Sequence, residues 1–176
     1  VSNFSLPGKE SRHNIRYWRM ENWLALGPGA SGTIINDRTG TGLRYTVKAD
    51  TGAWLNRRAG STRNGDSLDG NTCTGGPGYP GGWPPVTEEP LGRAVLIKET
   101  LLMGFRLAGG PDGELFQRRF GRGIGETIPG TIAAWQERGL FRKDRTALTG
   151  GGLLFLNPFL LDAFQEIDAH DRMKRE

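Results

Sequence analysis

The apolar residues of this chain gather in short runs up to residue 57 and follow a helical period after residue 90. In the first part, residues 23–26 (WLAL) end at a Gly-Pro-Gly loop, which predicts a buried strand that opens into a tight turn. Residues 43–47 predict a second short strand. Residues 11–20 alternate poorly, so we expect an irregular loop or edge segment there.

The later part predicts three helices in succession. Residues 91–107 place apolar side chains on two sides at helical spacing, which is typical of a mostly buried helix. Asp112 is a good N-cap for a second helix, and Gly121 can close it. A third helix is expected over residues 128–140, with Pro129 in its first turn.

A hairpin and a closing helix are expected to follow. Residues 141–148 and 153–156 flank Gly150-Gly151-Gly152, a pattern that predicts a β-hairpin. Asn157-Pro158 then predicts the start of a last helix that runs through Ile167, before a charged end that we expect to fray. Three helices, a hairpin and a closing helix indicate a winged-helix-like unit, so the predicted fold class is α+β.

The middle of the chain, residues 58–90, is rich in Gly, Pro, Ser, Asn and Thr and has almost no aliphatic residues. Such a segment cannot bury enough apolar surface to offset its ordering entropy, which predicts an exposed, mobile insert. Cys73, Tyr79 and Trp83 within it can form a docking spot or simply belong to a solvated loop.

Composition narrows the function classes. With 36% hydrophobic residues, 176 residues can bury one or two modest cores. No run approaches the ~20 apolar residues of a membrane span. A net charge of +4 is a mild excess, more typical of solubility than of nucleic-acid binding. One cysteine makes no disulfide framework, which favours a reducing compartment, so we expect a cytoplasmic protein.

A winged helix nevertheless raises the possibility of DNA binding. The expected recognition helix, residues 128–140, carries Arg138 as its one basic residue, with Glu126 and Glu137 nearby. A major-groove reader usually presents more hydrogen-bond donors. An interaction or DNA-binding module is therefore kept as a minor alternative.

The richest chemistry lies in residues 13–18 (HNIRYW). His13, Asn14, Tyr17 and Trp18 supply an imidazole, an amide and two aromatic faces within six residues, a set that can hold a flat, metal-bearing ligand. Histidine is the commonest proximal ligand of haem iron. The plain alternatives are that His13 hydrogen-bonds a nearby carbonyl and that both aromatic residues belong to a core.

HNIRYW, followed by GPGASG at residues 27–32, resembles the HNxxYW and GPGAHG motifs of the HemW-type haem chaperones. These are radical S-adenosylmethionine proteins related to oxygen-independent coproporphyrinogen III oxidase. The resemblance resumes at residues 99–107 (ETLLMGFRL) and continues to Ile167. It implies a protein that binds haem and passes it to an acceptor protein, with oxidative decarboxylation of coproporphyrinogen III as the alternative.

The resemblance also implies residue roles. It makes His13 the ligand of haem iron, with Asn14, Tyr17 and Trp18 around the porphyrin. Gly29 and Ala30 would lie on the S-adenosylmethionine side of a barrel, where glycines let the backbone approach a ligand.

The loop departs from the family at Ser31, where the family has histidine, and a possible second ligand or polar contact is lost. Residues 27–32 also match G-x-G-x-x-G, but residues 33–36 (TIIN) are β-branched, so the helix that a dinucleotide site requires is not expected.

The family carries a [4Fe-4S] cluster on a CxxxCxxC motif, and the single Cys73 cannot supply three thiolates. We therefore interpret the chain as the C-terminal part of such a protein, not an enzyme by itself. Residues 1–57 are expected to be the end of a radical-SAM barrel and 58–90 the insert. Residues 91–168 would be a HemN C-terminal-like, winged-helix-like domain, and 169–176 a charged tail.

Overall fold

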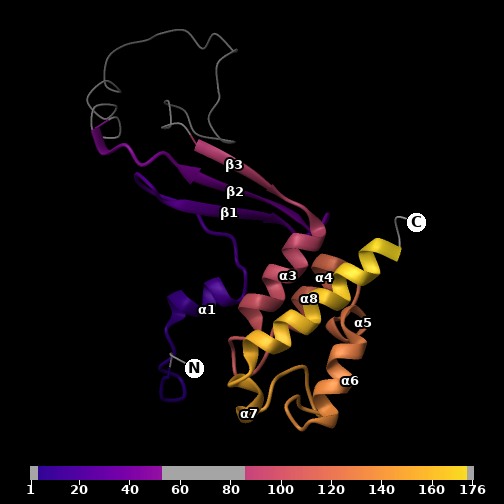
Figure 1. The fold of residues 1–176 in the computed structure, drawn as a ribbon. Helices are drawn as coiled ribbons and strands as arrows, with labels where there is room; N and C mark the ends of the chain where they lie inside the picture. The colour runs from indigo at the N-terminus through magenta and orange to yellow at the C-terminus, as the bar shows by residue number, and fades with distance from the viewer. Residues whose placement is uncertain (1–3, 53–85, 174–176) are drawn as a thin grey trace. The chain divides into compact units, whose positions relative to one another are not determined.

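The computed structural model describes residues 4–52 and 86–173, which form two compact units (Figure 1). The helical unit comprises the described residues of Val1–Glu21, Asn36–Thr41 and Gly92–Glu176, and the sheet unit those of Asn22–Ile35 and Gly42–Leu91. The combination of helices and a small sheet agrees with the predicted α+β class. The expected end of a barrel and the expected domain boundaries stay predictions.

The sheet unit contains three strands in the order β1-β2-β3: β1 is Ser31–Asn36, β2 is Thr41–Val47 and β3 is Val86–Leu91. The predicted strand at residues 43–47 is thus confirmed as part of β2. β2 and β3 run antiparallel, with Gly42 opposite Leu91 and Val47 opposite Val86.

Strand β3 begins within the segment expected to be the insert, since residues 86–90 belong to both. Thr87, Glu88, Glu89 and Pro90 are exposed, so backbone pairing with β2 rather than burial makes this segment a strand. The candidate docking residues Cys73, Tyr79 and Trp83 lie outside the described residues.

The strand expected at residues 23–26 is wrong. Trp23 forms an isolated bridge with Thr33, whereas Leu24 and Leu26 are 57% and 76% exposed. The backbone N–H of Ala25 donates to the Tyr45 hydroxyl at 2.8 Å. A side chain, instead of a neighbouring strand, therefore satisfies this donor.

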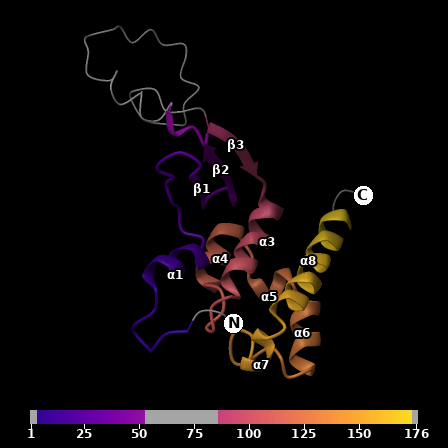
Figure 2. The same ribbon diagram turned by 60° about the vertical axis from the view of Figure 1, so that its left-hand side comes forward.

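The helical unit consists of α1 (Arg12–Trp18), α3 (Arg93–Gly104), α4 (Gly113–Phe120), α5 (Ile124–Thr127), α6 (Pro129–Glu137), α7 (Gly150–Leu153) and α8 (Leu156–Met173) (Figure 2). At its centre, the ring of Phe159 meets Phe105 and Trp135 edge to face, with centroids 4.7 and 5.3 Å apart. Such pairs contribute beyond the area they bury. The other fully buried large side chains of this unit are Leu96, Leu101, Phe116, Phe120, Ile128 and Ile167.

The predicted helix ends are largely confirmed. Asp112 Oδ1 accepts the backbone N–H of Leu115 at 2.9 Å, and Gly121 adopts the left-handed conformation (φ 65°) that closes α4. Pro129 is in the first turn of α6, as expected. Local capping signals therefore located these helices correctly.

The predicted hairpin after residue 140 is wrong. Phe141 and Leu148 form a single bridge, and the glycines 150–152 begin α7 because the Thr149 hydroxyl accepts the N–H of Gly152 at 3.0 Å. Among the described residues of this region no second strand pair exists, so the wing of a winged helix is not seen.

The fraying end expected from residue 168 is also corrected. Helix α8 continues to Met173, and Asp168 forms an ion pair with Lys98 on α3 at 2.5 Å. Within the described ranges, 4–52 and 86–173, no helix has both the length and the apolar character needed to span a bilayer.

Helices α6 and α8 are joined by a carboxylate that caps α6. Glu166 accepts the backbone N–H groups of Gly130 and Thr131, both at 2.8 Å, and the Thr131 hydroxyl at 2.6 Å. Asp162, one turn earlier on α8, accepts the indole N–H of Trp135 at 2.8 Å. The first turn of α6 thus obtains its acceptor from another helix.

Candidate functional site

The HNIRYW segment is helical, which corrects the irregular loop expected for residues 11–20. Ser11 is the N-cap of α1, and its hydroxyl accepts the N–H of Asn14 at 3.4 Å. The N–H of Ile15 donates to the Ser11 carbonyl at 3.0 Å, which begins the helical ladder. Periodicity missed this element because the segment is short and polar.

The C-terminal end of α1 has the hydrogen bonds of a Schellman motif. The N–H of Met20 donates to the Tyr17 carbonyl at 3.0 Å, and the N–H of Glu21 donates to the Arg16 carbonyl at 3.1 Å. Met20 has a φ of 52° and is only 2% exposed. A buried methionine therefore occupies a position that usually belongs to glycine.

The helix brings the four predicted haem-site residues onto adjoining rows. His13 is exposed, and its ring meets that of Tyr17 edge to face, with centroids 4.9 Å apart and an interplanar angle of 77°. Asn14 and Trp18, both partly buried, form the next pair at the same spacing of four residues. The imidazole is thus accessible and ordered by an aromatic neighbour.

The arginines of this segment lie on another side of α1. Arg12, Arg16 and Arg19 are exposed and spaced by four and three residues, so they form one stripe. At about 100° per residue, Arg16 is the member nearest to His13. It is 3.7 Å from Glu21 in an exposed ion pair, which contributes little to stability.

The glycine-rich loop belongs to the sheet unit, and two of its backbone N–H groups are used within that unit. The N–H of Gly29 donates to the Val47 carbonyl at 3.0 Å, and that of Ala30 to the Gly27 carbonyl at 3.3 Å. Ser31 begins β1 instead of a helix. The loop is therefore not followed by the helix N-terminus that a dinucleotide site requires. A role of Gly29 and Ala30 near S-adenosylmethionine stays a prediction.

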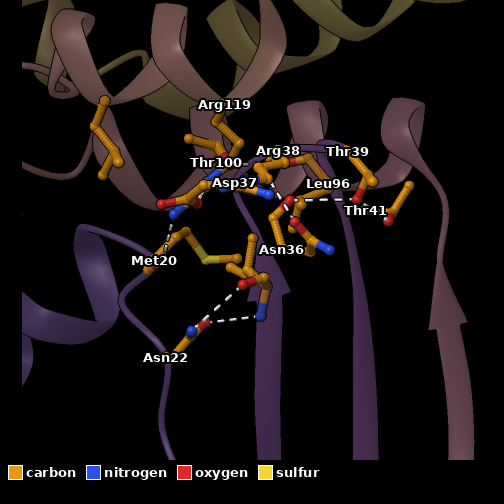
Figure 3. A network of polar contacts seen from close by, with 12 residues as sticks. Met20, Asn22, Asn36, Asp37, Arg38, Thr39, Thr41, Leu96, Thr100 and Arg119 are labelled. Atoms are coloured by element: carbon orange, nitrogen blue, oxygen red, sulfur yellow. Dashed lines mark hydrogen bonds and ion pairs between the residues drawn. The ribbon is translucent and has the colours of Figure 1, made fainter.

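Sequence reasoning missed a buried arginine in the helical unit. Arg119 on α4 is 4% exposed; its Nε donates to Asp37 Oδ1 at 2.8 Å and its Nη2 to the Met20 carbonyl at 3.3 Å (Figure 3). One signal was available, because Arg119 lies three residues after Phe116 and so on the apolar side of α4.

Metal-binding groups are sparse. In the part of the chain that the structure describes, no three His, Cys, Asp or Glu side chains gather at one point. Haem needs fewer protein ligands, because the porphyrin supplies four nitrogen ligands and one imidazole can provide the axial ligand of the iron. His13 is compatible with that requirement.

Comparisons with known proteins give partial matches. No family model and no solved structure matches the chain. A protein named heme chaperone HemW from Lactococcus lactis subsp. lactis (strain IL1403) is 30% identical over 120 residues, which is 68% of this chain and 24% of that protein. One of the same name from Bacillus subtilis (strain 168) is 27% identical over 159 residues, 89% of this chain and 35% of that protein.

A third relative, also named heme chaperone HemW, comes from Mycobacterium tuberculosis (strain ATCC 25618 / H37Rv) and is 53% identical over 34 residues, 19% of this chain and 9% of that protein. The chain spans only 24% and 35% of the length of the first two relatives. All three names agree, and the second match covers most of the chain. The chain is therefore related to the HemW family.

Proposed function

We propose that this chain is the haem-handling portion of a HemW-like haem chaperone, which binds haem through His13 and passes it to an acceptor protein. The observation that carries the proposal is the accessible imidazole of His13, ordered by Tyr17 on a capped helix. The names of the relatives support it independently.

In this proposal haem is the cargo. The His13 imidazole binds the iron, and the neighbouring aromatic side chains of Tyr17 and Trp18 cover part of the porphyrin face. Arg16 is placed to meet a carboxylate of the porphyrin, since it lies one turn after His13. A single exposed ligand suits a carrier, because an acceptor's own ligand can approach the iron and replace it.

The radical-SAM cofactors belong to the intact protein in this account. The chain has one cysteine, and a [4Fe-4S] cluster needs three or four thiolates. We therefore assign the cluster and S-adenosylmethionine to residues outside this sequence, with residues 1–57 as the end of the barrel. Residues 91–168 would form the C-terminal helical domain of that protein.

Haem titration of the intact protein tests this function. We expect saturable haem uptake with a Soret band typical of imidazole-ligated iron, and no decarboxylation of coproporphyrinogen III under anaerobic reducing conditions with S-adenosylmethionine. Porphyrinogen turnover would favour the oxidase alternative. A protein that takes up no haem would contradict the chaperone proposal.

A further inference from the structure

Helix α1 is too short to be stable by itself. It has seven residues, and isolated helices below about 12–15 residues are marginal in water. None of the residues within α1 is fully buried. Its position must therefore be fixed by contacts at its ends and by its packing against α3.

The contact at the C-terminal end is unusual because Met20 is left-handed and buried. A left-handed conformation is disfavoured for any residue with a Cβ, and it persists only where the surroundings hold it. The Met20 carbonyl accepts a hydrogen bond from Arg119, a residue 99 positions later in the sequence. The end of α1 is thus tied to α4.

Arg119 depends on its two described partners. Its charge is buried, and a buried charge is tolerated only when it is paired and hydrogen-bonded. Nε uses Asp37 and Nη2 uses Met20, whereas Nη1 is buried without a hydrogen-bond partner among the described residues. Since no other described hydrogen bond can compensate, we expect the loss of either bond to be strongly destabilising.

The turn that carries Asp37 is itself fixed in the helical unit. Gly40 is left-handed (φ 64°), and a Cβ there would lie 2.8 Å from the Arg119 carbonyl oxygen. The Arg93 guanidinium donates to the Thr39 carbonyl at 3.5 Å and also to the Phe120 carbonyl. The Asp37 side chain is 44% exposed, but the turn that carries it is held in place, so its carboxylate is positioned to accept from Arg119.

We infer that Arg119 is a positioning residue for α1: by bridging Asp37 and the Met20 carbonyl, it sets the placement of the helix that carries His13. Arg119 does not touch haem in this account, and it acts through α1. The inference rests on the proposed function only for its haem readout, because the placement of α1 can be measured without haem.

The test uses Arg119→Met, which removes both bonds, and Arg119→Lys, which keeps the charge but cannot form both in the same geometry. Arg118→Met is the matched control, since Arg118 is the exposed neighbour on the same helix. Amide hydrogen exchange is compared between residues 12–20 and α8. We expect exchange in residues 12–20 to be at least about tenfold faster in Arg119→Met, with a smaller change in α8 and none in Arg118→Met.

Haem titration of the same variants gives the second readout. Arg119→Met should bind haem about tenfold more weakly while keeping the imidazole-type Soret band, and Arg119→Lys should recover part of the affinity. If Arg119→Met does not fold, Asp37→Asn is used instead, because it removes the charge of one partner of Arg119. We then expect smaller changes in the hydrogen exchange of residues 12–20 and in haem affinity.

Two outcomes overturn the inference: unchanged exchange in residues 12–20, or an equal acceleration there and in α8, which would indicate a general structural role. If the wild type takes up no haem, the proposed function fails, but the exchange data still decide whether Arg119 positions α1.

Discussion

Helices α1 and α8 are stabilised in opposite ways. α8 has eighteen residues and buries Phe159, Leu160, Ala163 and Ile167, whereas α1 has seven and buries none. The candidate haem residues lie on the short helix, whereas the long helix contributes buried side chains to the core of the helical unit. If the proposed site is correct, the binding residues lie on an element whose position is set from elsewhere in the chain, which leaves its side chains exposed for a ligand.

The largest effect should come from the core of the long helix. Phe159→Ala removes a ring that touches Phe105, Trp135 and Phe141, so we expect a loss of about 3–5 kcal/mol in the free energy of unfolding. Trp18→Ala on α1 should cost only about 1 kcal/mol, because Trp18 is partly buried. Denaturant unfolding measures both. Equal losses would break the comparison.

An intermediate effect is expected at the turn beside Arg119. Gly40→Ala introduces a Cβ 2.8 Å from a backbone oxygen at a φ of 64°, which should cost about 2–3 kcal/mol. Gly139→Ala is the matched control, since Gly139 has a similar φ of 69° but nothing within 4 Å of its Cβ. It should cost about 1 kcal/mol. If thermal unfolding gives equal shifts, the turn is not packed against α4 as described.

A smaller effect on stability, which depends on pH, is expected from Glu166 on α8. Burial raises the pKa of Glu166, but the hydrogen bonds from Thr131 and Gly130, with nearby His170, bring its pKa below the ordinary 4.5. Because the folded pKa lies below the unfolded one, the stabilisation is present above about pH 4.5 and is lost as the pH falls through the folded pKa.

Glu166→Gln tests this contribution. At neutral pH it should lower the free energy of unfolding by about 1 kcal/mol, a modest value because the side chain is partly solvent-screened. The difference from wild type should shrink as the pH is lowered from about 5 to about 3. Glu137→Gln, at an exposed site on α6, serves as the control. A difference that stays constant with pH would refute the capping role of Glu166.

Local signals predicted the elements that depend on local chemistry. The capping and helix-start signals at Asp112, Gly121 and Pro129 each depend on only a few neighbouring residues. For this reason α4 and α6 could be placed from the sequence. The glycines 150–152 misled us, because glycine runs are typical of hairpins. Gly152 is instead required by close packing: a Cβ there would lie 2.0 Å from the Leu140 carbonyl oxygen.

The candidate site was predicted as a set of residues but not as a structure. His13 and Tyr17 could be chosen from their types and spacing, whereas their helical arrangement depends on caps in a polar segment. Arg119 lies 82 residues from Asp37 and 99 from Met20, and no local pattern encodes such pairings. Contacts of this kind arise only when the whole helical unit folds.

The central claim is that His13 binds haem, and His13→Ala in the intact protein tests it most directly. His170→Ala is the matched control, because His170 is the only other histidine in the chain and lies near Glu166 at the far end of α8. In a haem titration followed by Soret absorption, we predict that His13→Ala weakens uptake and shifts the band, whereas His170→Ala leaves both unchanged. Unchanged affinity and an unchanged Soret band in His13→Ala would contradict the account.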